Sequence, residues 1–387
     1  MIGVGDHGTG VNLRGFLGQP DARVVAVCDV DGKRCENARN MVNQQYGGQD
    51  CKTYRDFRDV IARQDIDAVM ISTPDHWHVP ISILAMREGK DVISEKPTLT
   101  IAEGRLQAET VRQLGAVFQT STEDRALAVY HRMAEIVRNG RIGKLKVIRV
   151  GLPDARRPNP PATPEPVPGD FDYDMWLGPA PLAPYCAKRC HFNFRWIYDY
   201  SGGMLTDWGM HLLDTAQWAN NSEFTGPVAV SGTGVFPSDG LYNTATEFHL
   251  EYEYAGGVKL FVESGAVFIR FEGTEGWIES QGWIGPMQAS SPAIFNAVIG
   301  AEDLKLCTCP GREHRNFLDC VKSRRNPYFP AEIGHRCATI QHIGNIALLL
   351  GRKLRWNPEK EEFTGDATAN SMRSRFMREP WGRLLTA

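Results

Sequence analysis

The sequence of 387 residues lacks any long run of like charge, and it contains no internal repeat. Its 43 basic and 46 acidic side chains leave a net charge of −3. This balance argues against nucleic acid or an anionic membrane as the main partner. No apolar run approaches the roughly 18 residues that a membrane-spanning helix needs. The chain is long enough for two domains, each with a full core.

A disulfide framework is not expected either. The nine cysteines are an odd number, and most fall in predicted strands or helices, which is typical of a reduced protein. Two groupings, Cys186-x3-Cys190-His191 and Cys307-x-Cys309, have the residue types of a metal site. Neither has the spacing of a common zinc site. We therefore expect no metal.

A glycine-rich turn stands almost at the start of the chain, Gly3-Val4-Gly5-Asp6-His7-Gly8. Its three glycines are spaced as in dinucleotide-binding turns, which need a tight bend, close approach to a pyrophosphate and close helix packing. A helix is predicted over 10–17, and Arg23–Cys28 is predicted to be a buried strand. Asp29 follows that strand, where a carboxylate binds the adenosine ribose hydroxyls. The sequence therefore predicts a nicotinamide-dinucleotide site. Asp29 favours NAD over NADP, although Lys33 or Arg34 could neutralise a 2′-phosphate.

Only Met1 and Ile2 precede the glycine turn, whereas a first strand of about five residues is expected in this fold. We therefore expect an apolar segment upstream in the gene, with or without a signal peptide. The chain as it stands predicts a cytoplasmic protein, and a lost upstream signal would make it an exported one.

Strand and helix signals alternate from the start to residue 122. Predicted strands lie at Ala68–Ser72, Asp91–Ser94 and Ala116–Thr120, and helices lie between them at Ile81–Glu88 and Ala102–Leu114. This alternation predicts a parallel sheet with right-handed crossovers, a Rossmann domain over 1–122. Ligands bind beyond the carboxyl ends of such strands. The expected crevice is lined by the glycine turn, Asp29, Thr73-Pro74-Asp75-His76 and Glu95-Lys96-Pro97.

The pattern changes in residues 123–387. Helices are predicted over 127–139, 203–219, 312–323 and 331–351, with strands near 144–151, 227–236, 244–254, 257–264, 267–271 and 275–280. Consecutive strands without intervening helices predict an open, mainly antiparallel sheet with helices on one face. The stretch from 153 to 184 is proline-rich and predicts an extended loop. The last thirty residues are expected to form an arm over the surface or over a partner subunit. The fold class is therefore α/β, with a Rossmann domain followed by an α/β domain.

The acid–base candidates are Asp207, His211 and Lys96. Asp207 and His211 are four residues apart on the predicted helix 203–219, so they project from one face. Lys96 ends a central strand, where a neighbouring cationic nicotinamide would lower its pKa. The approach to the helix is rich in polar and aromatic residues, which suits a sugar ring with its stacking face and its hydroxyl groups. An aromatic-rich core corner with ordinary polar caps is the alternative explanation.

These motifs resemble the glucose–fructose oxidoreductase / inositol dehydrogenase family, Gfo/Idh/MocA. The glycine turn, Thr73-Pro74-Asp75-x-x-His78, Glu95-Lys96-Pro97 and Gly203-x-x-x-Asp207-x-Gly209-x-His211 occur in that family's order. The resemblance implies that His211 is the general base, that Lys96 hydrogen-bonds the reacting oxygen, and that Asp207 positions both substrate and base. It also implies dimers or tetramers that assemble through the C-terminal sheet. Residues near 198–203 and 316–323 are similar to a branch that acts on sugars and glycosides.

The resemblance and the motifs together define two sets of expected ligand contacts. The cofactor residues are Gly3, Gly5, Asp6, His7, Gly8, Asp29, Thr73, Pro74, His76, His78, Glu95 and Lys96. The substrate residues are Lys96, Arg195, Trp196, Tyr198, Tyr200, Asp207, Trp208 and His211.

The function expected from the sequence is an NAD-dependent dehydrogenase of a sugar or glycoside, acting on a ring secondary alcohol, with carbon 3 of a hexopyranoside as the expected position. A neutral carbohydrate is expected rather than a phosphorylated one, unless Arg156 and Arg157 fold over the site. The alternative is a redox-neutral glycosidase that oxidises the sugar transiently, eliminates the aglycone and returns the hydride. A non-catalytic regulator is a third class, against which the retention of Lys96, Asp207 and His211 argues.

Overall fold

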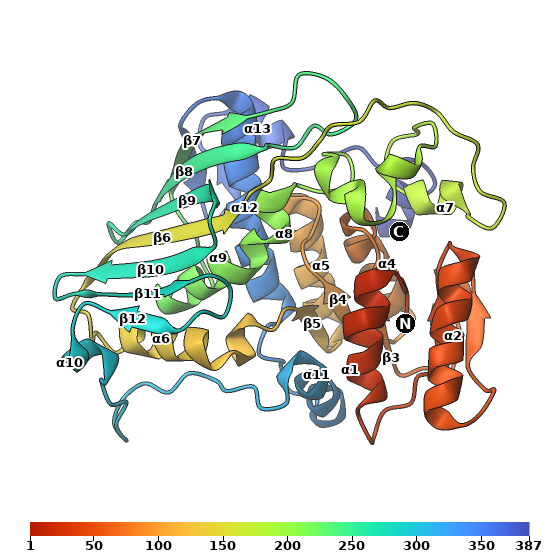
Figure 1. Cartoon of the computed structure of the whole chain (residues 1–387), viewed down its shortest axis with the longest axis horizontal. Helices are drawn as coiled ribbons and strands as arrows, with labels where there is room; N and C mark the ends of the chain where they lie inside the picture. Colours follow the sequence, from red (N-terminus) through yellow and green to blue (C-terminus); the bar gives the residue numbers. More distant parts are fainter. Residues whose placement is uncertain (387) are drawn as a thin grey trace.

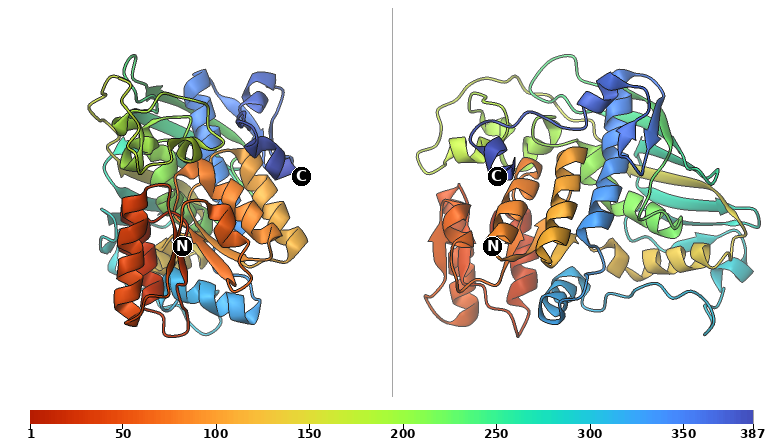
Figure 2. Two further views of the ribbon diagram at one scale, coloured as in Figure 1. Left: turned by 90° about the vertical axis from the view of Figure 1, so that its right-hand side faces the viewer. Right: turned by 180° about the vertical axis from the view of Figure 1, so that it is seen from behind.

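The computed structural model describes residues 1–386. Two sheets lie in the two halves of the molecule, and the long helix α12 (Ala331–Leu350) runs between them (Figures 1 and 2). The predicted α/β architecture is confirmed: a parallel sheet comes first, followed by a mainly antiparallel one. No helix within residues 1–386 has both the length and the apolar character required to cross a membrane.

The N-terminal sheet is parallel throughout, in the order β2-β1-β3-β4-β5, with Ile2 between β1 and β3. Its strands are β1 (Ala26–Cys28), β2 (Lys52–Tyr54), β3 (Ala68–Ile71), β4 (Asp91–Glu95) and β5 (Phe118–Ser121). Each strand that the sequence analysis predicted here is present, and β2 is an addition.

Ile2 takes the central place where a first strand of about five residues was expected. It pairs in parallel with both Cys28 and Ile71. The Ile2 N–H donates to the Met70 carbonyl at 2.8 Å, and the Ile2 carbonyl accepts from the Ser72 N–H at 2.8 Å. Met1 and Ile2 thus join β1 and β3 into one sheet and lead into the glycine turn at its carboxyl edge.

Helices cover both faces of the N-terminal sheet. Where the chain leaves the glycine turn it forms a π-helical stretch, Gly8–Leu13, which continues into α1 (Arg14–Leu17). The side chain of Asp31 accepts from two backbone N–H groups of the next helix, and that of Thr100 caps another in the same way, because these first-turn donors have no partner inside a helix. The remaining helices are α2 (Gly32–Tyr46), α3 (Phe57–Ile61), α4 (Asp75–Arg87) and α5 (Ile101–Leu114).

The C-terminal sheet has nine strands in the order β12-β11-β10-β6-β9-β8-β7-β13-β14. Only the β6–β9 pair is parallel. The strands are β6 (Leu145–Pro153), β7 (Ala229–Val235), β8 (Glu247–Glu253), β9 (Lys259–Gly265), β10 (Phe268–Gly273), β11 (Trp277–Gln281), β12 (Met287–Ala289), β13 (Leu354–Asn357) and β14 (Glu362–Phe363).

Only one face of this sheet is buried. In β8, Phe248, Leu250 and Tyr252 are buried and alternate with more exposed polar residues such as Glu247 and His249, because successive side chains of a strand point to opposite faces. The buried face packs on α6 (Ala128–Arg138), α9 (Gly209–Ala219) and α12.

The predicted helix over 203–219 is two helices. α8 (Met204–Asp207) ends at Trp208, and α9 begins at Gly209. Trp208, the single residue between the two helices, keeps helical φ and ψ of −88° and −24°.

The C-terminal arm folds back on the N-terminal half of the same chain. It carries α13 (Ala367–Ser371) and α14 (Trp381–Thr386). The buried Trp381 ring packs edge-on against Trp77, with centroids 4.6 Å apart, and also lies against Phe57. The arm thus covers the surface of its own Rossmann domain. The proline-rich stretch 153–184 is mostly irregular, as expected, apart from α7 (Tyr173–Leu177).

Candidate active site

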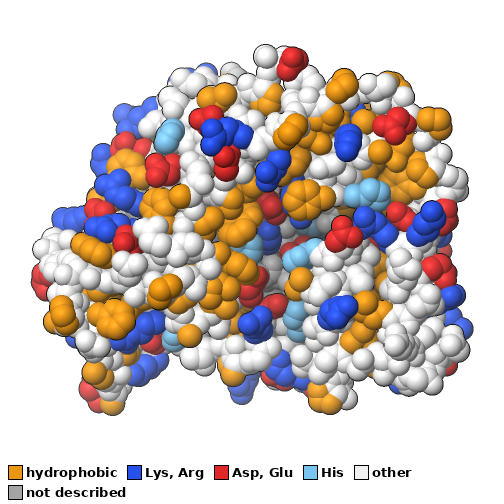
Figure 3. Space-filling model, in the orientation of Figure 1, with side chains coloured by type: hydrophobic (Ala, Val, Ile, Leu, Met, Phe, Trp, Pro, Cys, Tyr) orange, Lys and Arg blue, Asp and Glu red, His pale blue; other side chains and the backbone are white. Residues whose placement is uncertain are grey.

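A cavity of about 390 Å³ lies between the two halves of the molecule. In the space-filling view a hollow opens at the centre of the face, and acidic, basic and histidine side chains gather in it (Figure 3). Its walls combine the carboxyl edge of the parallel sheet with residues from α8, α9 and the loops before them. The cavity therefore joins the predicted cofactor site to the predicted acid–base residues.

The glycine turn forms one end of the cavity. Gly3 has a φ of +81°, and a Cβ there would lie 2.6 Å from the backbone of Ser72. A Cβ on Gly8 would lie 2.5 Å from the Gly3 carbonyl oxygen. Both positions therefore require glycine, for the turn and for close packing of the following helix. Such a cradle fits a dinucleotide pyrophosphate.

Asp29 lies beside this turn, at the end of β1, as predicted. Its carboxylate accepts from the Val4 N–H at 2.8 Å and from the Asp31 N–H at 2.9 Å. Each oxygen retains a lone pair for a ribose hydroxyl. Arg34 also lines this end, but its guanidinium is paired with Asp6 at 3.3 Å and with Asp31 at 3.6 Å.

Glu95 connects the turn to the middle of the cavity. It accepts a hydrogen bond from Asn12 Nδ2 at 2.8 Å, and it lies 2.9 Å from His7 Nε2. Burial alone would raise the pKa of Glu95, but the hydrogen bond and charge of His7 and the charge of Lys96 bring it down to about 2. Glu95 is therefore an anion at the wall of the cavity.

Lys96 is held by Asp207. Its Nζ donates to Asp207 Oδ1 at 2.9 Å and to the Asp207 carbonyl at 2.7 Å. Arg195 donates to the other carboxylate oxygen at 3.2 Å. Burial lowers the pKa of Lys96, but Asp207 and Glu95 outweigh it, so the net shift is upward. The expectation of a lowered lysine pKa is not met in this arrangement, because two carboxylates surround the ammonium group.

His211 is braced by a carboxylate that sequence spacing did not indicate. Its Nδ1 lies 2.5 Å from Asp124 Oδ2. Asp124 is fully buried and also accepts from Thr122 Oγ1 and Trp283 Nε1. The pKa of Asp124 is lowered, chiefly by His211 against the effect of burial. Since an ionised carboxylate only accepts, His211 donates its Nδ1–H and leaves Nε2 for the cavity.

Asp207 was expected to position both substrate and base. Within residues 1–386 it accepts hydrogen bonds from Lys96 and Arg195, and no hydrogen bond joins its side chain to His211. Burial lowers the pKa of His211, but the charge and hydrogen bond of Asp124 raise it further, so the net shift is upward. The two candidates four residues apart therefore have different hydrogen-bonding partners.

Several residues expected at the substrate lie behind the cavity wall. Tyr200 is fully buried and Trp196 is 3% exposed, and neither lines the cavity. Tyr198 lies outside the wall too, with the guanidinium of Arg375 over its ring at 3.8 Å. These rings support the loop, whereas Arg195 and Trp208 do reach the cavity as expected.

The predicted cofactor residues also divide into those that line the cavity and one that does not. Gly3, Gly5, Asp6, His7, Gly8, Asp29, Thr73, Pro74, His78, Glu95 and Lys96 line the cavity. His76 does not: it is fully buried, with Nε2 2.9 Å from the Trp176 carbonyl, and burial lowers its pKa to about 4. The ring nitrogens of His78 lie 2.8 Å from the carbonyls of Pro97 and Thr73, so His78 also ties two strand ends together.

The arginines of the proline-rich loop do not reach the site. Arg156 pairs with Asp154, and the Arg157 guanidinium lies 4.7 Å from the centroid of the Trp196 ring. All nine cysteines are free. Within residues 1–386 the cysteine groupings form no cluster of potential metal ligands, and the cluster that does occur is Glu123, Asp124 and His211.

Sequence reasoning missed a group of residues that line or brace the cavity. Trp283 enters from the turn after β11, and its ring lies 5.9 Å from that of Trp208 at 76°. Glu123 and Asp124 follow β5, at a further carboxyl strand end. The position of Glu123-Asp124 after a strand was the available signal. Nothing in the local pattern marks Trp283, which comes from the other domain.

Family comparison follows these observations. Residues 1–122 match the family described as "Oxidoreductase family, NAD-binding Rossmann fold", and residues 159–383 match "Oxidoreductase family, C-terminal alpha/beta domain". The chain belongs to the Gfo/Idh/MocA oxidoreductase family. The predicted family and the predicted NAD-binding domain are confirmed.

Curated relatives in this family match over shorter stretches. A glycosyl hydrolase family 109 protein of Saccharopolyspora erythraea is 33% identical over 128 residues, 32% of this chain and 26% of the relative. A 1,5-anhydro-D-fructose reductase of Ensifer adhaerens is 31% identical over 100 residues, 26% of this chain and 30% of the relative. The matched part thus spans less than a third of either relative.

Solved structures of similar fold cover nearly the whole chain. The WlbA dehydrogenase from Bordetella pertussis, in complex with NADH and UDP-GlcNAcA, has a TM-score of 0.70 at 14% identity and covers 92% of this chain and 97% of its own. Myo-inositol 2-dehydrogenase from Lactobacillus plantarum has a TM-score of 0.64 at 20% identity, with the same coverage of 92% and 97%. At these identities the likeness shows the shared fold.

Proposed function

We propose that this family member is an NAD-dependent dehydrogenase of a neutral sugar or glycoside, which oxidises a ring secondary alcohol at carbon 3 of a hexopyranoside. The observation that carries the proposal is the placement of Lys96, Asp207 and His211 in one cavity with the glycine turn. Alcohol oxidation needs a base for the hydroxyl proton and a group that holds the oxygen. This cavity offers both.

The roles follow from the contacts. When bound, NAD supplies the hydride acceptor. His211 accepts the hydroxyl proton at Nε2, because Asp124 engages Nδ1. Lys96 donates a hydrogen bond to the reacting oxygen, and Asp207, which accepts from Lys96 and Arg195, keeps the ammonium group in place. Trp208 and Trp283 offer aromatic faces to the carbohydrate ring.

A neutral substrate suits the charges around the cavity. Arg195 is engaged by Asp207, and Arg156 and Arg157 have partners elsewhere. Phosphate recognition usually recruits clustered free arginines. The structure therefore supports a neutral carbohydrate over a sugar phosphate.

NAD is the expected cofactor in preference to NADP. The carboxylates of Asp29 and Asp31 lie at the ribose end, and Arg34 is already paired with carboxylates. A 2′-phosphate would meet this negative charge. Titration of the apo-protein with both cofactors measures the preference, and tighter binding of NADP contradicts it.

The test of function uses purified protein, NAD and a panel of 4-nitrophenyl and methyl glycosides. We expect a rise in absorbance at 340 nm with stoichiometric formation of a keto-glycoside. No absorbance change and no product with any member of a wide panel would refute the proposal.

Redox-neutral glycoside cleavage is the second candidate, because several curated relatives are named glycosyl hydrolase family 109 proteins. In that case the protein would release the aglycone catalytically with only its own bound cofactor. Aglycone release without external NAD decides for this candidate, and NADH accumulation decides for net oxidation.

A further inference from the structure

Glu123 lies at the cavity wall, and the proposed oxidation gives it no role. It lies between β5 and the short helical turn Asp124–Ala126. Its side chain lines the cavity. Within residues 1–386 its carboxylate has no ion pair and no hydrogen bond from another residue, although its own backbone N–H lies within hydrogen-bonding reach. A carboxylate oxygen of Glu123 lies within 4.8 Å of ligand atoms of both Asp124 and His211. A carboxylate without a partner from another residue thus lies beside the proposed base, His211.

The surroundings of Glu123 raise its pKa. Burial raises its pKa, the charge of His211 lowers it, and the charges of Asp124 and Glu313 raise it again, so the net shift is upward. A raised pKa makes a carboxylate a stronger base, and its position in the cavity lets it exchange protons with a bound substrate. The neighbouring Asp124 differs, because its oxygens are engaged by His211, Thr122 and Trp283.

Oxidation of an alcohol releases one proton, which His211 accepts, so a second acceptor in the cavity exceeds what oxidation requires. We propose that Glu123 is a second acid–base residue, placed to remove the proton from the carbon next to the newly formed ketone. This inference rests on the proposed function, and it names the group that glycoside cleavage in this cavity needs.

The chemistry balances with one water molecule. With a ketone at carbon 3, Glu123 takes the proton from carbon 2, the carbon 1–carbon 2 double bond forms, and the carbon 1–oxygen bond to the aglycone breaks. The leaving oxygen takes a proton from water. The resulting hydroxide adds to carbon 1 while Glu123 returns its proton to carbon 2. The hydride that the cofactor took up in the oxidation then returns to carbon 3, and the ketone oxygen regains its proton from His211, which restores the alcohol.

A divalent cation is the other use for Glu123, Asp124 and His211. The contact of 2.5 Å between His211 Nδ1 and Asp124 Oδ2 pairs two of the three ligand atoms with each other. Thr122 and Trp283 occupy Asp124 further. Metal ligation requires these atoms to be deprotonated and directed at the ion, so the contacts favour the acid–base role.

The first experiment needs no substrate. Nitrogen-15 NMR of the histidine side chains follows the titration of His211 in the wild type, in Glu123→Gln and in the matched control Glu313→Gln. We expect the His211 midpoint to fall in Glu123→Gln, because the charge of Glu123 raises the His211 pKa, and to stay in the control. An unchanged midpoint, or stoichiometric Mn²⁺ binding that Glu123→Gln abolishes, overturns the proposal.

The second experiment follows the chemistry in D₂O with NAD and 4-nitrophenyl β-D-glucopyranoside, or whichever glycoside in the panel forms NADH. The wild type should incorporate deuterium at the carbon next to the oxidised one, or release 4-nitrophenol. Glu123→Gln should lower this rate by a factor on the order of 10², and by a larger factor than it lowers first-turnover NADH formation.

The outcomes separate the two proposals. NADH formation without exchange or release by the wild type refutes the role of Glu123 and leaves the dehydrogenase standing. Equal exchange in Glu123→Gln also refutes it. If no glycoside forms NADH, the proposed function fails, while the His211 titration still decides whether Glu123 is coupled to the base.

Discussion

At the scale of single residues, the cavity contains two hydrogen-bonding groups, Lys96 and His211, and each is held by a different carboxylate. Lys96 is fixed as a cation by Asp207, and His211 is fixed in one tautomer by Asp124. A permanent cation holds the oxygen on which negative charge develops, whereas a neutral imidazole accepts the proton. The contacts thus give Lys96 the role of holding the oxygen and His211 the role of accepting the proton.

Lys96→Ala and His211→Ala should each lower turnover by a factor on the order of 10² or more, as for other lost acid–base groups. Cofactor affinity should be nearly unchanged, since the glycine turn and Asp29 are not altered. Steady-state kinetics with NAD titration checks both. A variant that folds normally and retains most of its turnover would show that its role is wrongly assigned.

Asp124→Asn tests the bracing of His211 through the pH profile. The base must be neutral to accept a proton, so activity falls below the His211 pKa, which Asp124 raises. Loss of the carboxylate should therefore move the acidic limb of kcat/KM to lower pH and reduce kcat by a factor on the order of 10². An acidic limb at the wild-type position would show that Asp124 only fills space.

At the scale of elements, the carboxyl edge of the parallel sheet determines where the chemistry lies. The glycine turn, the ends of β3 and β4 and the residues after β5 all reach this edge, and α8 and α9 face it from the other half. Helix α5 packs against α12. It carries Glu103, a carboxyl group whose pKa is raised by burial.

Glu103 in α5 makes the stability of the fold depend on pH. Burial raises its pKa to about 7, and its Oε2 has no partner within the described residues. A raised pKa means that its contribution is present at acidic pH and is lost as pH rises through about 7. Between about pH 5 and 8 the wild type should lose about 3 kcal/mol of unfolding free energy through Glu103, and the Glu103→Gln variant should not show this loss.

Urea unfolding of the wild type and the Glu103→Gln variant at several pH values measures this difference. Subtraction of the two profiles cancels the contribution of the histidines, which titrate in the same pH window in both proteins. Parallel profiles would contradict the assignment of the loss to Glu103.

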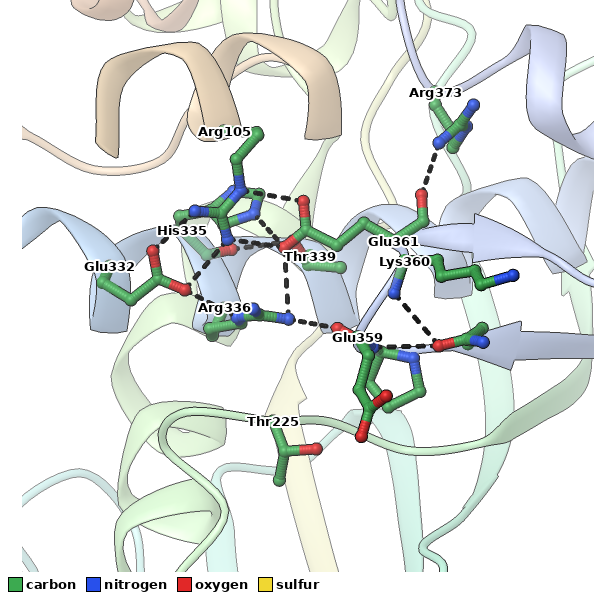
Figure 4. A network of polar contacts seen from close by, with 12 residues as sticks. Arg105, Thr225, Glu332, His335, Arg336, Thr339, Glu359, Lys360, Glu361 and Arg373 are labelled. Carbon is green, nitrogen blue, oxygen red and sulfur yellow. Dashed lines mark hydrogen bonds and ion pairs between the residues drawn. The ribbon is translucent and has the colours of Figure 1, made fainter. Parts of the chain in front are cut away.

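At the scale of the whole molecule, a network of ion pairs joins the two halves behind the cavity (Figure 4). Arg105 of α5 donates to Glu332 of α12 at 2.7 and 2.9 Å and to Glu361 at 2.7 and 3.0 Å. His335 Nε2 lies 2.7 Å from Glu361, and Arg336 pairs with Glu332. The network fixes the N-terminal half against the helix that supports the second sheet.

Arg105→Ala should lower the free energy of unfolding by about 2 kcal/mol, because it leaves two partly buried carboxylates with fewer partners and the arginine is itself partly screened by solvent. Arg352→Ala is the matched control, since it removes a more exposed pair with Asp366 and should cost below about 1 kcal/mol. Denaturant unfolding compares them. Equal losses would show that the network does not couple the halves.

Much of this protein follows from its local sequence. The alternation of β-branched strands and helices up to residue 122, and the run of strands after residue 227, predict both sheets, because side-chain periodicity is a local property. The glycine turn, Asp29, Lys96 and His211 are recognisable because each follows a strand or lies on a helix in a family-like order. The short strands β2, β12, β13 and β14, of two to four residues each, were not predicted, because so few residues carry little periodicity. The helix α2 was not predicted either.

Only the tertiary structure decided which groups meet. Asp124 and His211 are 87 residues apart and are in contact at 2.5 Å, and Trp283 reaches Asp124 from the second sheet. Asp207 and His211 both line the cavity, but Asp207 accepts from Lys96 and Arg195, whereas His211 contacts Asp124. Trp196, Tyr198 and Tyr200 have the composition of a sugar site, but packing turns them away from the cavity. Sequence spacing determines which residues share an element, whereas long-range packing determines which side chains share a cavity.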